Sequence, residues 1–121
     1  MTTGVLVILF IFSFLTGSSY KTLDQSIAYE ELMTDSSIEL IDVREPSEFA
    51  TGYIFGAQLI PLNTIESTIE NIILEKDTKI FVYCRSGNRS AQAAQILADL
   101  GYTNVFDIGG IIDWEYGIVN N

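Results

Sequence analysis

Short apolar runs alternate with amphipathic stretches along this chain from about residue 20 onward. Four runs have the length and the bounding residues of buried strands, at 38–43, 57–62, 79–83 and 104–108. Segments with apolar residues at helical spacing lie between them, at 23–34, 63–73 and 90–100, and Gly101 follows the last as a helix-ending residue. Pro46 and Gly52 bound a further helical turn. This alternation predicts an α/β fold with a parallel sheet covered on both faces.

The apolar run nearest the start of the chain differs from these four. Residues 5–15 are apolar except for Ser13, and small polar residues follow at 17–19. That layout is typical of a secretory signal peptide, and the run is shorter than the roughly 20 residues that a membrane span needs. We therefore expect residues 1–19 to be a signal peptide, residues 20–121 to form one domain, and the protein to be exported, in a bacterium to the periplasm. Because no Lys or Arg precedes the run, an uncleaved membrane anchor is the alternative.

Charge excludes some partners and suggests another. The formal net charge of −10 would repel nucleic acids and anionic membrane surfaces. Only six residues are basic, yet Arg85 and Arg89 flank Gly87 just after Cys84. In so acidic a chain, this clustering indicates a local site for a small anion.

Cys84 is the only cysteine, and the chain has no histidine. Catalytic triads, Cys-His dyads, HExxH zinc sites, CxxC redox pairs and cysteine-rich metal sites are therefore excluded. The cysteine lies one residue beyond a predicted strand and just before a helix, at the sheet edge where α/β proteins bind ligands. Amides at a helix N-terminus favour a thiolate, and Gly87 lets the loop curl so that they converge on the sulfur. A buried structural cysteine is the alternative, but it needs neither the glycine nor the arginines.

Two stretches of the sequence carry a resemblance to a known family. They are LIDVREPSEFATGYIFGAQLIPL at 40–62 and VYCRSGNRSAQAAQILADLGYTNVFDIGGIIDW at 82–114. With the order of elements between them, they make residues 23–117 resemble a single-domain rhodanese, a thiosulfate sulfurtransferase-like protein. The resemblance implies a three-layer α/β/α sandwich around a five-stranded, mainly parallel sheet. It also implies sulfur chemistry, because related phosphatases and arsenate reductases have a loop one residue longer than the six residues from Cys84 to Arg89.

The resemblance further implies a mechanism without a metal or other cofactor. The Cys84 thiolate would take a sulfane sulfur from a small anionic donor such as thiosulfate, hold it as a persulfide, and pass it to cyanide or a thiol. The expected substrate-binding loop consists of Arg85, Ser86, Gly87, Asn88 and Arg89. Its amides would stabilise the anionic sulfur. Arg89 would steady the loop and attract the donor, and Arg85 would do the same more weakly.

Supporting roles are implied for residues on the neighbouring strands. Asp42 and Arg44 would lie at the adjacent strand end, with Arg44 holding nearby carboxylates and backbone, and Gly109 and Gly110 would let the last loop approach the site. Tyr53 stands where many members have a histidine, and we interpret three aromatic residues as core: Phe81, Phe106 and Trp114. The alternative function is a persulfide carrier or binding module that accepts sulfur from, or donates it to, a protein partner without turnover of small molecules.

Overall fold

The computed structural model of the protein describes residues 19–120. The predicted signal peptide therefore lies outside the described residues, apart from Ser19. Within the described part of the chain, no helix has the length and apolar character needed to cross a membrane.

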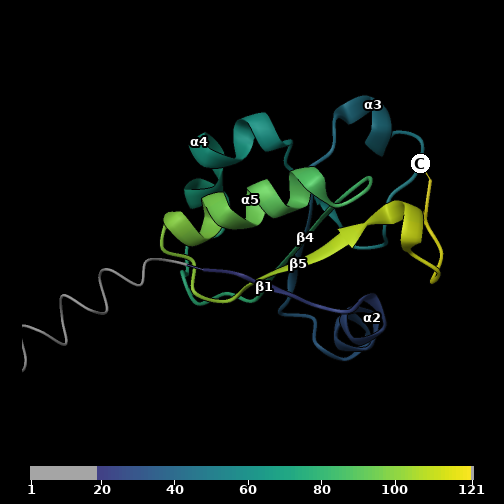
Figure 1. The fold of residues 1–121 in the computed structure, drawn as a ribbon, viewed down its shortest axis with the longest axis horizontal. Helices are drawn as coiled ribbons and strands as arrows, with labels where there is room; N and C mark the ends of the chain where they lie inside the picture. The colour runs from purple at the N-terminus through teal and green to yellow at the C-terminus, as the bar shows by residue number, and fades with distance from the viewer. Residues whose placement is uncertain (1–18, 121) are drawn as a thin grey trace, which may run out of the picture.

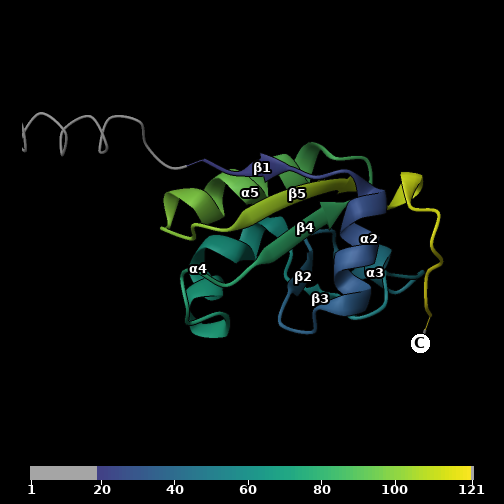
Figure 2. The same cartoon turned by 90° about the horizontal axis from the view of Figure 1, so that it is seen from below.

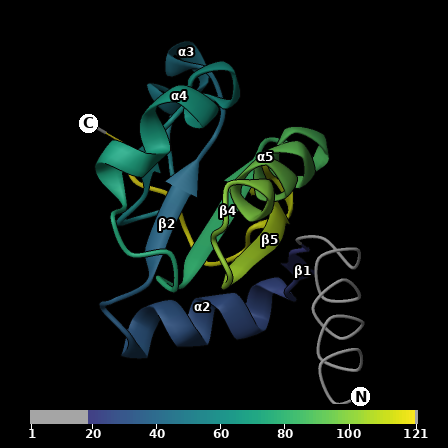
Figure 3. The same ribbon diagram turned by 90° about the vertical axis from the view of Figure 1, so that its left-hand side faces the viewer.

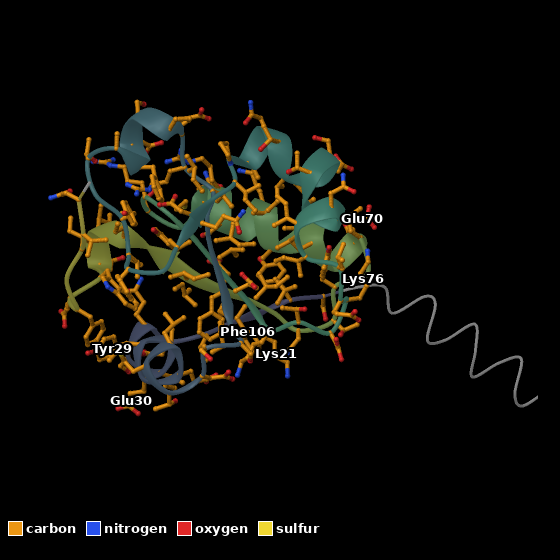
Figure 4. The ribbon with its side chains drawn as sticks, turned by 180° about the vertical axis from the view of Figure 1, so that it is seen from behind. Lys21, Tyr29, Glu30, Glu70, Lys76 and Phe106 are labelled. Carbon is orange, nitrogen blue, oxygen red and sulfur yellow. The ribbon has the colours of Figure 1, made fainter. Side chains whose placement is uncertain are left out.

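A single sheet of parallel strands forms the centre of the molecule, in the order β1-β5-β4-β2-β3. The strands are β1 Lys21–Thr22, β2 Glu39–Asp42, β3 Gln58–Leu59, β4 Ile80–Cys84 and β5 Val105–Gly110. β1 has no counterpart among the four predicted apolar runs because it is two exposed residues at the sheet edge, where Lys21 pairs with Phe106 (Figure 4). The five-stranded α/β fold is otherwise as expected.

Helices cover both faces of the sheet and make the three predicted layers. α2 (Gln25–Thr34) lies on one face, and α4 (Leu62–Ile72) and α5 (Asn88–Asp99) lie on the other (Figures 1 and 3). Two short helical turns, α3 (Pro46–Phe49) and the 3₁₀ turn η1 (Ile111–Asp113), follow β2 and β5.

The central strand β4 shows how the sequence builds two cores. Successive side chains of a strand point to opposite faces. Ile80, Val82 and Cys84 accordingly pack in the cluster beneath α4 and α5, whereas Phe81 and Tyr83 pack in the cluster beneath α2. All five side chains are buried, which explains why this segment reads as a continuous apolar run.

Several helix details differ from the prediction. On α2 the buried residue is Ala28, whose small side chain lets the helix approach the sheet, while Ile27 and Met33 remain exposed although their spacing suggested an inward face. Ile72 of α4 is likewise exposed. α4 begins at Leu62 with Pro61 at the N-cap position, earlier than the start predicted after Pro61 and Leu62.

Candidate functional site

The site lies at the carboxyl edge of the sheet, where β2, β4 and β5 end on the same side as α3, η1 and the C-terminal segment (Figure 2). Cys84 is the last residue of β4, so the prediction that it lies one residue beyond the strand is wrong by one position. The difference arises because Cys84 still pairs with Gly110 of β5 after a local shift in register. α5 begins at Asn88, two residues earlier than predicted, with Gly87 as its cap.

The loop between Cys84 and α5 folds back on the sulfur. Gly87 has a φ of 112°, which a residue with a side chain rarely adopts, and its N–H donates a hydrogen bond of 3.0 Å to Cys84 Sγ. The Cys84 thiol lies 3.5 Å from the Ser90 hydroxyl, to which it donates, and Ser90 in turn donates to the Gly87 carbonyl over 3.0 Å. Backbone and hydroxyl groups therefore contact the sulfur from the α5 side.

Cys84 is 1% exposed. Burial alone would suit a structural cysteine, but an apolar core position needs no amide donor or hydroxyl beside its sulfur. Ser90 was not predicted to be a site residue. Its position in the first helical turn after Gly87 could have indicated that its hydroxyl lies near the sulfur. Its side chain belongs to the polar surroundings of the sulfur.

β5 and α2 support this loop from the other side. A Cβ atom on Gly110 would lie 2.3 Å from the carbonyl oxygen of Arg85, so only glycine allows the two backbones to approach so closely. The Ile112 N–H donates to the same oxygen over 3.2 Å. Gln25 of α2 fixes the end of β5 by donating to the carbonyls of Ile108 (2.8 Å) and Gly110 (3.0 Å). Gly110 thus lies directly against the backbone of the cysteine loop, and no sequence motif pointed to Gln25.

A buried ion pair joins Asp42 and Arg44 at the end of β2. Arg44 Nη2 approaches Asp42 Oδ2 to 2.7 Å, and the same group donates to the carbonyl of Gly52 over 2.7 Å. Burial opposes the charge of Arg44, but its hydrogen bonds to Asp42 and the carboxylate's charge outweigh this and raise the pKa of Arg44. Arg44 thus contacts a carboxylate and a backbone carbonyl, and its supporting role in the reaction stays a prediction.

A second ion pair joins the loop to α3. Arg89 donates to the two carboxylate oxygens of Glu48 over 2.7 and 2.9 Å. The hydrogen bonds from Arg89 lower the pKa of Glu48 from its ordinary 4.5 to about 2. These contacts agree with a loop-steadying role for Arg89, while its attraction for an anionic donor stays a prediction. Glu48 was not predicted to be a site residue, because the sequence shows only an acidic residue in the first turn of a short helix.

Arg85 differs from Arg89 in having no charge partner. Its side chain is exposed and makes no hydrogen bond or ion pair with any of residues 19–120. Over the same range, no group of three or more His, Cys, Asp or Glu side chains is arranged to hold a metal ion.

Two open pockets flank the loop. One has a volume of about 510 Å³, and its lining includes Arg44, Glu48, Arg85, Ile112, Trp114 and Ile118. The other, of about 530 Å³, is bordered by Ser86, Gly109 and Gly110. Cys84 lines neither pocket, since the loop lies between them. Phe81 is buried and Phe106 packs against the core as predicted, but Trp114 is a pocket residue as well as a core contact.

The geometry can be compared with known proteins. Residues 26–116 match the family model described as a rhodanese-like domain. The chain belongs to the rhodanese-like domain family. It is 38% identical over 73 residues to the thiosulfate sulfurtransferase PspE of Escherichia coli K12, an alignment that covers 60% of this chain and 70% of that protein. It is 37% identical over 93 residues to a sulfurtransferase of Allochromatium vinosum, covering 76% and 85%.

Solved structures agree with this assignment. A rhodanese-related protein from Thermoplasma volcanium superimposes with a TM-score of 0.73 at 33% identity, over 84% of this chain and 100% of that one. The rhodanese-like fold predicted from the sequence is therefore confirmed, and sulfur transfer is the activity that the named relatives share.

Proposed function

We propose that this rhodanese-family protein is a sulfurtransferase that carries a sulfane sulfur on Cys84. The donor is thiosulfate or a related compound, and the acceptor is cyanide or a thiol. The observation that carries the proposal is the hydrogen bond from Gly87 N–H to Cys84 Sγ, which provides a donor for an anionic sulfur where the chain has no histidine base. The sulfurtransferase names of the relatives support the same chemistry.

The first half of the reaction forms the persulfide. The Cys84 thiolate attacks the outer sulfur of thiosulfate, and the sulfur–sulfur bond of the donor breaks with its electron pair leaving on sulfite. The thiolate and the thiosulfate dianion become a persulfide anion and a sulfite dianion, so charge is conserved. In the second half, the acceptor takes the outer sulfur and restores the thiolate. No external oxidant or reductant takes part.

The surroundings of Cys84 set a condition on this reaction. Because its side chain is 1% exposed, the loop of residues 84–89 has to admit the donor's outer sulfur to reach Sγ. The Gly87 N–H then supports the negative charge on the thiolate and on the persulfide.

Steady-state kinetics with thiosulfate and cyanide test the proposal. We expect thiocyanate to form catalytically with the wild-type protein and not with Cys84→Ser, whose circular dichroism spectrum should match the wild type because the two side chains are nearly isosteric. A Cys84→Ser variant with full activity would overturn the assignment. A wild-type protein that acquires sulfur without turning over would instead support the alternative function of a persulfide carrier for a protein partner.

We also propose, from the apolar leader alone, that the domain is exported and that residues 1–19 are removed. The mass of the protein recovered from the exported fraction tests this. A species beginning near residue 20 is expected, and a species that retains Met1 would contradict removal of the leader.

A further inference from the structure

A third cavity lies on the face of the sheet that α2 covers, and no residue of the cysteine loop lines it. Its lining comes from four segments, at 29–36, 38–40, 54–56 and 114–117. We call this cavity the α2 groove. Its volume of about 450 Å³ lies within the range of roughly 300–1,000 Å³ that is typical of binding sites.

The α2 groove leaves large apolar side chains in water. Phe55 is 81% exposed and Met33 is 67% exposed, and both line the groove. Beneath them, Ile38, Leu40 and Ile54 are buried in the core cluster under α2. One exposed apolar residue needs no explanation, but apolar residues gathered around one groove are typical of a surface on which another molecule packs.

Aromatic contacts hold the groove in shape before anything binds. Tyr116 stacks on Tyr29 of α2 with ring centroids 4.2 Å apart, and the Trp114 ring meets Tyr116 edge-on at 5.0 Å. Trp114 Nε1 also donates to the carbonyl of Gly117 over 3.1 Å. Figure 4 shows Tyr29 on α2. A lining that is already ordered loses little conformational entropy when a partner binds against it.

Charge around the groove favours a positively charged partner. The segments 29–40, 54–56 and 114–117 contain no basic residue, and their acidic residues are Glu30, Glu31, Asp35, Glu39 and Glu115. Asp35 lines the groove, and Lys79 pairs with Glu31. The acidic side chains left over attract basic groups and repel acidic ones.

The same charge argues against a second copy of this chain, which would bring its own net charge of −10 to the groove. A small molecule held within the cavity would leave most of Phe55 in water, since that side chain is largely exposed. A polypeptide is large enough to fill the cavity and to cover Phe55 and Met33 as well.

We propose that the α2 groove docks a basic segment of a partner protein. The segment places a bulky apolar side chain against Phe55 and Met33, and its lysine or arginine side chains lie near Asp35 and Glu30. The docking surface lies outside the cysteine site, so the inference goes beyond the proposed sulfur transfer and does not depend on it.

The chain contains a reporter for this binding, because Trp114 is its only tryptophan and lines the groove. The probe is the blocked hexapeptide Lys-Lys-Phe-Leu-Lys-Lys. In one control peptide serines replace the apolar pair, and in the other glutamates replace the lysines. Fluorescence titration of the full-length protein at low ionic strength should give a Kd at least about tenfold lower for the probe than for either control.

Substitutions of exposed side chains locate the binding. Phe55→Ser and Met33→Ser are each expected to raise the Kd of the probe about fivefold. Leu74→Ser is the matched control, because Leu74 is 74% exposed and does not line the groove, and it should leave the Kd unchanged.

A charge variant tests the electrostatic part. Asp35→Asn removes the negative charge but keeps the oxygen that accepts hydrogen bonds from Ser37. It should raise the Kd about two- to threefold at low ionic strength, and added salt should remove this difference. An unchanged Kd at low ionic strength would show that Asp35 does not attract the partner and would contradict the proposal.

Several outcomes would overturn the inference. Equal binding of the three peptides would show attraction to the acidic surface as a whole, and an unchanged Kd in both Phe55→Ser and Met33→Ser would place the probe elsewhere. Sedimentation that shows a dimer in the wild type but not in Phe55→Ser would assign the groove to a second copy. A full-length protein that binds no peptide, as expected if residues 5–15 occupied the groove, would also contradict it.

The result can be separated from the cysteine chemistry. Cys84→Ser should bind the probe with the wild-type Kd, whether or not Cys84 accepts sulfur in the unmodified protein. A Kd that rises in this variant as much as in Phe55→Ser would place the peptide at the cysteine loop and overturn the inference.

Discussion

Two arginine–carboxylate pairs flank the cysteine loop, and they differ in burial. The side chains of Arg44 and Asp42 are 5% and 0% exposed, whereas those of Arg89 and Glu48 are 30% and 26% exposed. Arg44 also donates to a backbone carbonyl, that of Gly52, beyond its carboxylate. The buried pair therefore fixes the end of β2, while the partly exposed pair connects α3 to the first turn of α5.

The difference in burial implies different roles for these two arginine–carboxylate pairs. A buried charge that loses its partner has no solvent to replace it. Substitution of either Asp42 or Arg44 should therefore be strongly destabilising. Water reaches the Glu48–Arg89 pair and weakens it. We therefore predict that Arg89 on the loop can exchange its carboxylate partner for another anion, whereas Arg44 behind the loop cannot.

The largest expected effect comes from breaking the buried pair. Asp42→Asn leaves the Arg44 guanidinium buried without its counter-charge and should lower the free energy of unfolding by roughly 3–5 kcal/mol. Urea unfolding followed by circular dichroism measures this. The double variant Asp42→Asn/Arg44→Gln should lose less than the sum of the two single variants. Strictly additive losses would show that the two side chains do not stabilise one another.

Acid should weaken the partly exposed pair over a defined pH range. The pKa of Glu48 is lowered from 4.5 to about 2 in the folded protein, so the stability it contributes is complete above about pH 4.5 and is lost as the pH falls toward 2. Because water reaches the pair, we expect the contribution to be about 1 kcal/mol or less. Unfolding free energies of wild type and Glu48→Gln, measured from pH 6 downward, should converge as acid is added. A constant difference over this range would mean that Glu48 acts otherwise than through its charge.

The smallest expected effect concerns the donor. Glu48→Gln removes the carboxylate from Arg89 and leaves its positive charge free beside the pocket, which should lower KM for thiosulfate about two- to threefold without a matching change for an uncharged donor. Initial rates at low ionic strength measure this, and added salt should reduce the difference. An increase in KM for both donors would indicate that Glu48 is needed to hold the loop in place.

The sequence predicted those features that depend on local pattern. The alternation of apolar runs and amphipathic segments predicted the parallel sheet. Gly87, three residues after Cys84, predicted a tight loop, and in the structure its N–H donates to the sulfur. The end of the strand before the loop was predicted one residue too early, at Tyr83 instead of Cys84. In a sequence, the last residue of a buried strand and the first residue beyond it look alike. The resemblance to rhodaneses implied supporting roles for Arg44 and Gly110. In the structure Arg44 contacts Asp42 and Gly52, and Gly110 lies against the backbone of Arg85.

Features that depend on distant contacts could not be predicted in this way. The partner of Arg89 lies 41 residues away on a short helix, and the carbonyls bound by Gln25 lie 83 and 85 residues away. Ile27 and Met33 have helical spacing, yet the packing of Ala28 against the sheet turns them outward. Gly117 and Ile118 near the end of the chain line the pocket beside Arg85. Their position depends on a bridge between Tyr53 and Val119, which no sequence periodicity indicates.

The most direct measurement of the central claim is the intact mass of the protein after incubation with thiosulfate. The chain has a single cysteine, so a mass increase equal to one sulfur atom, reversed by cyanide, reports persulfide formation at Cys84. We predict that increase in the wild type and its absence in Cys84→Ser. An unchanged mass in the wild type under conditions that leave the protein folded, or an added sulfur that persists in the variant, would contradict the account.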